Sequence, residues 1–362
     1  MTSSAQSNAV RGTDVREGDA CAPTGADRRG PEEVSEGVVR IPGGLALQHG
    51  GSLAEAIVAW RLAGAAGAPV VLALGGISAH RCVYSIGQRG GWWDALVGPG
   101  KALDSRRFRI LGCDFIGGSG DSTGPGEEPG FPTVSTHDQA AAAVAVLDAL
   151  RISSLHAIVG ASYGGMVALA FAERHPERVQ RLLIIGACDR NHPQATAWRS
   201  VQRRIVRFAI EQGNGKAGLE LARALAMITY RTPEEFGARF GAAPRTGAAA
   251  DGANRVVFPV EDYLFARGAD YAARYRPEAF LCLSESIDLH AVDAASIRTP
   301  STLVAVREDQ LVPHVDVQAC ARLIGGHASV HEINSSFGHD AFLKEPLQLA
   351  PIFSASLTGK LP

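Results

Sequence analysis

The stretch "LHAIVGASYGGMVALAFAERHPERV" (155–179) decides the fold of this chain. Its apolar first part is typical of a strand buried on both faces of a parallel sheet, and its second part has helical composition. The pattern G-x-S-x-G, centred on Ser162, stands between the two parts. A serine between small residues on a strand–turn–helix connection is the pattern of a nucleophile elbow, whose backbone is strained and closely packed. This context favours a nucleophilic Ser162 over a serine that merely occupies a tight bend.

Similar segments occur on both sides of this stretch and repeat its alternation of apolar strands and helices. The predicted strands, apart from the one at 155–162, cover residues 37–41, 44–50, 54–64, 69–76, 108–115, 181–188, 301–309 and 328–334. The predicted helices cover residues 137–152, 164–179 and 339–357. Short apolar strands that alternate with helices predict an α/β fold with a doubly wound, mostly parallel sheet.

Three regions of different composition divide the chain. Residues 1–36 are polar and contain no apolar segment of the signal-peptide type, so we expect a disordered tail and a cytoplasmic protein. Residues 37–188 and 299–362 carry the strand–helix alternation and form the predicted core. Residues 189–298 interrupt it with mostly helical composition and a glycine-rich loop, which predicts a helical lid over the carboxyl edge of the sheet.

Composition and short motifs argue against several classes of function. The net charge of −2 gives no reason to expect nucleic acid or an anionic membrane as a partner, and the apolar runs are too short for a transmembrane helix. The six cysteines form no C-x-x-C pair, and no Cys/His cluster has metal-binding spacing. The glycine runs match neither the phosphate-binding nor the dinucleotide-binding pattern. We therefore expect no metal and no cofactor.

A nucleophilic serine needs a histidine base, and in this kind of fold the acid and then the histidine follow it along the chain. His339 in "SSFGHDAF" is the histidine that combines a late position with a loop between the last strand and the last helix. The competing histidines lie in the insertion, beyond the acid loop, on a surface loop or within a predicted strand: His290, His314, His327 and His331.

The acid is expected directly after the strand "STLVAV", where Glu308 and Asp309 both stand. Asp309 is preferred because D-x-x-V/I-P is the usual form of this loop, and Glu308 remains the alternative. An oxyanion hole needs two donors. The expected donors are the backbone N–H of Tyr163, directly after the nucleophile, and a backbone N–H near Ile77, after the strand at 69–76.

Four further segments carry a family resemblance, which covers about residues 45–358. They are "GWWDALVGPGKALDSRRFRILGCDFIGGSGDSTGP" (91–125), "ITYRTPEEFGARF" (228–240), "VEDYLFARGADYAARYRPEAFLCLSESIDLH" (260–290) and "FGHDAFL" (337–343). With these motifs the chain resembles the homoserine O-acyltransferases of the α/β-hydrolase superfamily. The resemblance implies the α/β-hydrolase fold and a homodimer formed through the helical insertion.

The resemblance also implies a mechanism and a set of residues. Ser162 would take an acyl group from acyl-CoA, with Asp309 as acid and His339 as base, and the hydroxyl of L-homoserine would then take the acyl group from the serine. Arg231, in the T-Y-R segment, and Asp340, after the catalytic histidine, would bind the amino acid. Such a pair suits a zwitterion, which needs a cation for its carboxylate and an anion for its ammonium group.

The acyl donor and the acceptor remain open at this stage. The Asp-x-Leu form of "REDQLVP" favours acetyl-CoA, whereas the arginines of "AWRSVQRR" (197–204) could either meet the carboxylate of a succinyl group or form a solvated helix face. With either donor, the resemblance implies a step of methionine biosynthesis. Serine in place of homoserine, or water in an esterase, are the alternative acceptors. The elbow also departs from the family's usual G-G-S-M-G-G-M-Q, because Tyr163 replaces the methionine and Val167 the glutamine.

Overall fold

An eight-stranded sheet organises the computed structural model, which describes residues 32–127, 130–248 and 254–359. The strands in spatial order are β1 (Glu32–Arg40), β4 (Ile57–Ala65), β8 (Arg109–Cys113), β5 (Val70–Leu74), β9 (Ala157–Ala161), β10 (Leu182–Ile185), β13 (Ser301–Val306) and β14 (Ala328–Ile333). The first two pairings are antiparallel and the rest are parallel. The predicted doubly wound, mostly parallel sheet is confirmed.

Alternate residues of each parallel strand pack on opposite faces of this sheet. On β5, Leu72 and Leu74 belong to one apolar cluster, whereas Val71 and Ala73 belong to another. The first cluster is completed by α1 (Thr136–Ala149), α2 (Tyr163–Arg174) and α8 (His314–Leu323), and the second by α9 (Ala341–Lys344), α10 (Pro346–Thr358) and the segment 83–108. Burial on both faces explains why these strands read as continuous apolar runs.

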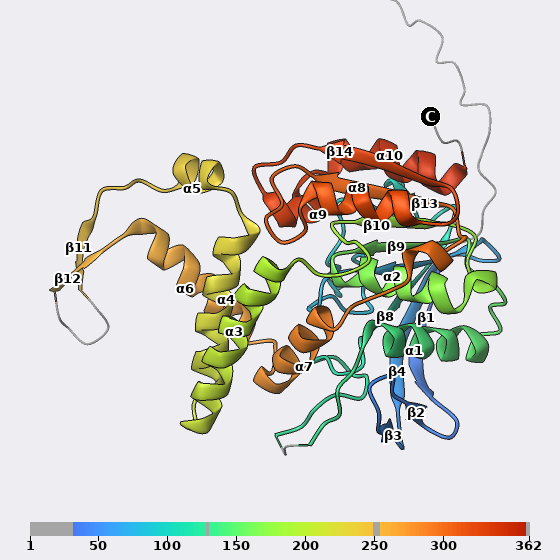
Figure 1. The fold of residues 1–362 in the computed structure, drawn as a ribbon, viewed down its shortest axis with the longest axis horizontal. Helices are drawn as coiled ribbons and strands as arrows, with labels where there is room; N and C mark the ends of the chain where they lie inside the picture. Colours follow the sequence, from blue (N-terminus) through green and yellow to red (C-terminus); the bar gives the residue numbers. More distant parts are fainter. Residues whose placement is uncertain (1–31, 128–129, 249–253, 360–362) are drawn as a thin grey trace, which may run out of the picture.

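The segment between β10 and β13 forms the helical insertion. Its helices are α3 (Pro193–Glu211), α4 (Gly215–Tyr230), α5 (Pro233–Arg239), α6 (Pro259–Ala272) and α7 (Pro277–Asp288). Figure 1 shows α3, α4 and α6 standing beside the sheet, with α7 between them and the core. The antiparallel pair β11 (Arg245–Ala248) and β12 (Asn254–Val257) reaches away from the sheet, where the sequence predicted only a glycine-rich loop.

Three details differ from the sequence-based expectations. β1 already begins at Glu32, so residues 32–36 belong to a strand and not to the predicted tail; residues 1–31 lie outside the described residues. The strand expected at 44–50 shrinks to β2 (Leu45–Ala46), paired with β3 (Ser52–Leu53). The single C-terminal helix expected at 339–357 is divided, because α10 starts at Pro346, whose ring cannot continue the preceding helix.

Candidate active site

Ser162 occupies a strained turn between β9 and α2. Its backbone has φ 52° and ψ −122°, a conformation that residues other than glycine rarely adopt. The glycines around it are required by close backbone contacts. A Cβ on Gly160 would lie 2.3 Å from the carbonyl oxygen of Gly164, and a Cβ on Gly164 would lie 2.4 Å from the backbone of Leu74. The G-x-S-x-G pattern is therefore a packing requirement that leaves the serine exposed to the cavity above it.

The structure brings the three residues predicted as a triad into one hydrogen-bonded line. His339 Nε2 lies 2.8 Å from Ser162 Oγ, and His339 Nδ1 lies 2.6 Å from Asp309 Oδ2. The second carboxylate oxygen, Asp309 Oδ1, accepts the backbone N–H groups of Leu311 at 2.8 Å and Val312 at 3.0 Å. The three side chains follow β9, β13 and β14, whose carboxyl ends meet at the same edge of the sheet. This geometry suits a serine nucleophile with an oriented histidine base.

Two opposing effects set the protonation of His339. Burial is the largest single effect and lowers its pKa, but the charge and the hydrogen bond of Asp309, with the charge of Asp340, together outweigh it, so the pKa lies above the ordinary value of 6.5. Asp340 adds to the increase and Arg199 opposes it. A base whose pKa is raised towards neutrality accepts a proton readily from a serine hydroxyl.

The alternatives weighed from the sequence lie elsewhere. Glu308 turns away from the histidine, and its Oε2 accepts the backbone N–H of Ser335 at 2.7 Å. His290 is buried between α1 and the end of β10, with Thr136 Oγ1 at 2.8 Å and the carbonyl of Cys188 at 3.1 Å. Burial lowers the pKa of His290 to about 3, so it stays neutral in the folded protein. His314 begins α8, His327 precedes β14 and His331 lies within it.

Of the two predicted oxyanion donors, Tyr163 directly follows Ser162 and Ile77 lines the cavity. Tyr163 is the first residue of α2, where helical backbone N–H groups have no partner within the helix. Ile77 lines the same cavity as Ser162. Its carbonyl accepts a hydrogen bond of 2.8 Å from the hydroxyl of Tyr275, which lies between α6 and α7. The Ile77 backbone is therefore held by the insertion as well as by the core.

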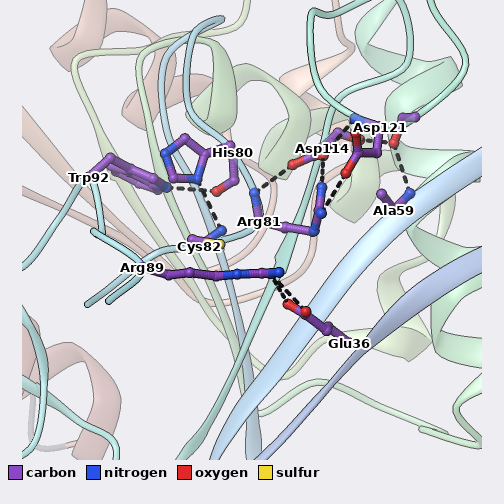
Figure 2. Close-up of polar contacts among 10 residues, drawn as sticks. Glu36, Ala59, His80, Arg81, Cys82, Arg89, Trp92, Asp114 and Asp121 are labelled. Carbon is purple, nitrogen blue, oxygen red and sulfur yellow. Dashed lines mark hydrogen bonds and ion pairs between the residues drawn. The ribbon is translucent and has the colours of Figure 1, made fainter. Parts of the chain in front are cut away.

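The loop after β5, which carries Ile77, is anchored on its far side by a polar network (Figure 2). The backbone N–H of Arg81 donates to Asp114 Oδ1 at 2.7 Å, and its guanidinium pairs with the same carboxylate. The indole of Trp92 donates to the carbonyl of His80 at 2.9 Å. These contacts fix both the backbone and the side-chain end of the loop, as a preorganised oxyanion site requires.

A cavity of about 170 Å³ opens above the serine. The elbow and the triad contribute Ser162 and His339, whereas the insertion contributes two arginines, Arg199 from α3 and Arg223 from α4. Asp340, directly after the histidine, also lines it. A second cavity of about 360 Å³ shares Arg223 and the loop after β5 with the first, so Arg223 stands where the two spaces meet.

The two residues predicted to bind the amino acid contact each other. Arg231 Nε lies 3.0 Å from Asp340 Oδ2, and the guanidinium also reaches Glu235 at 3.4 Å and stacks 5.2 Å from the ring centre of Phe337. Asp340 lines the cavity, but Arg231 is not among the residues that do. Arg231 is the C-cap of α4, with extended φ −110° and ψ 162°, so its side chain leaves the direction set by the helix.

Arg223 is the residue that sequence reasoning missed. Its Cζ lies 5.1 Å from the ring centre of Tyr230 and 4.7 Å from that of Tyr271, and within the described residues it makes no ion pair with a carboxylate. A helix repeats its face about every 3.6 residues, so Arg223 and Tyr230, seven residues apart on α4, share one face. The seven-residue spacing between Arg223 and Tyr230, just before Arg231, was the feature of the sequence that could have pointed to Arg223.

Known proteins match this chain over most of its length. A model of the α/β hydrolase fold family matches residues 69–346. The homoserine O-succinyltransferase of Xanthomonas campestris pv. campestris is 43% identical over 335 residues, which is 92% of this chain and 86% of the relative. The chain belongs to the homoserine O-acyltransferases of the α/β-hydrolase superfamily. The resemblance stated from its motifs is confirmed.

Members of this family differ in the acyl group that their names record. The homoserine O-acetyltransferase of Thermus thermophilus is 36% identical over 291 residues, covering 74% of this chain and 72% of that protein. The crystal structure of homoserine O-acetyltransferase from Bacillus anthracis has a TM-score of 0.79 at 17% identity, covering 90% of this chain and 97% of that one, which shows a shared fold. The comparisons leave the choice between acetyl and succinyl unresolved.

The described residues offer neither a membrane span nor a metal site. None of their helices has both the length and the apolarity to cross a membrane. Within residues 32–127, 130–248 and 254–359, no three or more histidine, cysteine or carboxylate side chains are grouped to hold a metal ion.

Proposed function

We propose that this enzyme moves an acyl group from acyl-CoA to the hydroxyl of L-homoserine through an acyl-Ser162 intermediate. The observation that carries the proposal is a serine–histidine–aspartate line that opens into a cavity with a cation, Arg223, and a carboxylate, Asp340. The identity of 43% to a homoserine O-succinyltransferase supports the acceptor.

In the first half-reaction, Ser162 Oγ attacks the thioester carbonyl while His339 Nε2 takes the hydroxyl proton. The carbonyl oxygen becomes an oxyanion beside the N–H groups of Tyr163 and Ile77. Collapse of this intermediate breaks the carbon–sulfur bond, and the imidazolium gives its proton to the leaving CoA thiolate. Asp309 holds the imidazole in the required tautomer and stabilises its charge.

In the second half-reaction, the homoserine hydroxyl attacks the acyl ester, and His339 takes its proton and returns one to Ser162 Oγ. We assign the ammonium group to Asp340, the carboxylate that lines the cavity, and the amino-acid carboxylate to Arg223. Arg223 is preferred to Arg199 because it lies against the rings of Tyr230 and Tyr271, whereas Arg199 is paired with Asp288. Burying either charge of a zwitterion without a partner would be costly. Arg231 then acts behind Asp340, holding that carboxylate in place.

Stepwise measurement of the two half-reactions tests this proposal. The protein is mixed with acetyl-CoA or succinyl-CoA, and acyl-Ser162 is detected by intact mass; homoserine, serine or buffer alone is then added. We expect the acyl group to leave rapidly only with homoserine. Faster loss with serine would replace the acceptor, and equally fast loss in buffer would identify an esterase. The absence of any acyl-enzyme would contradict the covalent mechanism.

The homodimer implied by the family resemblance is also part of this proposal. Large apolar side chains on neighbouring insertion helices are exposed: Leu221 by 51% and Ile228 by 48% on α4, and Phe265 by 54% on α6. Apolar groups gathered in this way are typical of a surface that a second protein chain covers. Light scattering coupled to size-exclusion chromatography, on wild type and on Phe265→Lys, measures whether the dimer forms through these helices.

A further inference from the structure

A buried charge cluster joins α3 and α7 at the wall of the Ser162 cavity. Arg199 Nη2 lies 2.6 Å from Asp288 Oδ1, and Arg203 pairs with the other oxygen of the same carboxylate. Arg203 also donates to the carbonyl of Ser284 at 3.0 Å. The side chains of Arg199, Arg203 and Asp288 are 11%, 11% and 9% exposed. Two guanidinium groups therefore share one carboxylate, which leaves one positive charge in excess.

The excess charge faces the cavity. Of the three members of the cluster, only Arg199 lines it, and Gln202, three residues further along the same helix, lines it too. Arg199 and His339 line the same cavity, and the charge of Arg199 lowers the pKa of His339 against the stronger effect of Asp309. A cation in a partly desolvated pocket is stabilised when a bound group brings an anion to it.

The charges of the substrates and of the cavity can then be compared. Among the described residues that line the cavity, the charged groups besides His339 are Arg199, Arg223 and Asp340. The zwitterionic acceptor uses one cation and one anion, and the proposed function assigns these to Arg223 and Asp340. Arg199 is left without a partner from the acceptor. An acetyl group brings no charge, whereas an acyl group that ends in a carboxylate brings the missing anion.

We infer that the acyl group carried by Ser162 ends in a carboxylate, as in succinyl-CoA, and that Arg199 binds this carboxylate. The inference rests on the proposed function and reverses the preference for acetyl-CoA drawn from the acid loop. Arg199 is already oriented by Asp288 and by Asn191 Oδ1, which accepts from its Nη2 at 3.0 Å. A planar guanidinium fixed in this way suits a carboxylate better than a mobile lysine would.

Tyr163 supports this wall from the core. Its side chain is fully buried, and its hydroxyl lies 2.7 Å from Ser286 Oγ on α7, two residues before Asp288. The methionine that the family usually has after the nucleophile cannot form this hydrogen bond. Tyr163 therefore acts as a positioning residue that ties α7, and with it Asp288 and Arg199, to the nucleophile elbow.

The test compares succinyl-CoA with butyryl-CoA, which has the same number of acyl carbons but no terminal charge, and with acetyl-CoA. Formation of acyl-Ser162 is followed by intact mass and CoA release. We expect wild type to prefer succinyl-CoA in kcat/KM, and Arg199→Gln to lower the succinyl-to-butyryl ratio about 10- to 150-fold, the usual effect of a hydrogen bond to a charged group. Arg199→Lys should keep part of the ratio. Arg204→Gln, on the same helix but with a side chain 70% exposed, is the matched control and should keep the wild-type ratio.

The outcomes separate this inference from the proposed function. Wild type acylated faster by butyryl-CoA or acetyl-CoA than by succinyl-CoA would overturn the inference and leave homoserine acyl transfer standing. Equal losses with all three thioesters in Arg199→Gln would also overturn it, because Arg199 would then serve the CoA portion or the fold. No acyl-Ser162 from any thioester would instead refute the proposed function. Melting curves of each variant show whether it is folded, and Arg199→Lys retains the buried charge pair if Arg199→Gln does not fold.

Discussion

The triad and the arginines of the cavity are built in two different ways. Ser162, Asp309 and His339 follow three parallel strands, so the sheet alone brings them to one edge. Arg199 and Arg223 project from α3 and α4, and their positions depend on how the insertion packs over that edge. The core therefore carries the groups proposed for acyl transfer, together with Asp340, whereas the insertion carries the two arginines proposed to bind the substrates.

The largest expected effect removes the nucleophile from the core. Ser162→Ala should abolish the acyl-enzyme and lower turnover by about 10⁴-fold or more, because a triad without its serine retains only binding and the oxyanion hole. The alanine must adopt the strained backbone of Ser162, so circular dichroism checks the fold. Near-normal acyl transfer in this variant would contradict an acyl-Ser162 intermediate, and the core would then not supply the nucleophile.

The acid gives the next largest effect. Asp309→Asn should cost about 10⁴-fold in turnover, because the histidine would lose its tautomer and its counter-charge. Glu308→Gln is the adjacent control and should cost little, since Glu308 contacts the backbone of Ser335 and not the histidine.

The pH dependence of acylation, compared between wild type and Asp309→Asn, gives a second test of the acid. His339 must be neutral to act as a base, so the rate should rise with pH through a pKa above 6.5 in wild type. In Asp309→Asn this pKa should fall, because the carboxylate that raises it is gone. An unchanged profile would show that another group controls the rate.

A substitution in the insertion should affect the second half-reaction more than the first. Arg223→Gln should raise the KM for homoserine about 10- to 150-fold, the loss expected for a hydrogen bond between charged groups, and should affect formation of acyl-Ser162 much less. Stopped-flow acylation and steady-state transfer, measured on one preparation, give both values. Arg231→Lys keeps the charge beside Asp340 and should raise this KM less. A larger increase for Arg231→Lys would restore the assignment made from the sequence.

Sequence reasoning succeeded where local pattern and position in the sheet determine the geometry. The elbow around Ser162, the loop position of Asp309 and the late His339 each follow a predicted strand, and parallel strands end at one edge. The structure places Arg231 outside the cavity lining, because Arg231 directly follows Tyr230, the last helical residue of α4, and is a C-cap with extended backbone. That change of direction sends Arg231 behind Asp340, and a sequence motif does not record it.

Two other features depended on contacts between distant segments. The polar start of β1 at Glu32 has almost no buried side chain, and its strand conformation comes from backbone pairing with β4. The shared carboxylate of Asp288 lies 85 residues from Arg203 in the chain. The sequence therefore suggested the arginines of residues 197–204 for a succinyl group without showing that, of these, Arg199 is the one that lines the cavity.

The smallest expected effect tests Tyr163, a residue that contacts both regions. The backbone N–H of Tyr163, in the core, is a proposed oxyanion donor, and its hydroxyl contacts α7 of the insertion through Ser286. Tyr163→Phe keeps the backbone and the ring but removes a neutral hydrogen bond, which contributes about 0.5–1.5 kcal/mol. We expect the kcat/KM for succinyl-CoA to fall about 2- to 12-fold, and that for butyryl-CoA to fall less, since the carboxylate of succinyl reaches Arg199 and butyryl has none.

A double-mutant cycle with Ser286→Ala assigns this effect to the hydrogen bond. If Tyr163 acts through Ser286, the double variant should lose no more succinyl preference than either single variant. Independent, additive losses would mean that Tyr163 shapes the pocket through its packing against Phe115, whose ring centre lies 4.9 Å away. Equal losses with both thioesters would mean that the substitution disturbs the oxyanion hole. Tyr163 would then affect the rate of acylation but not the choice of acyl group.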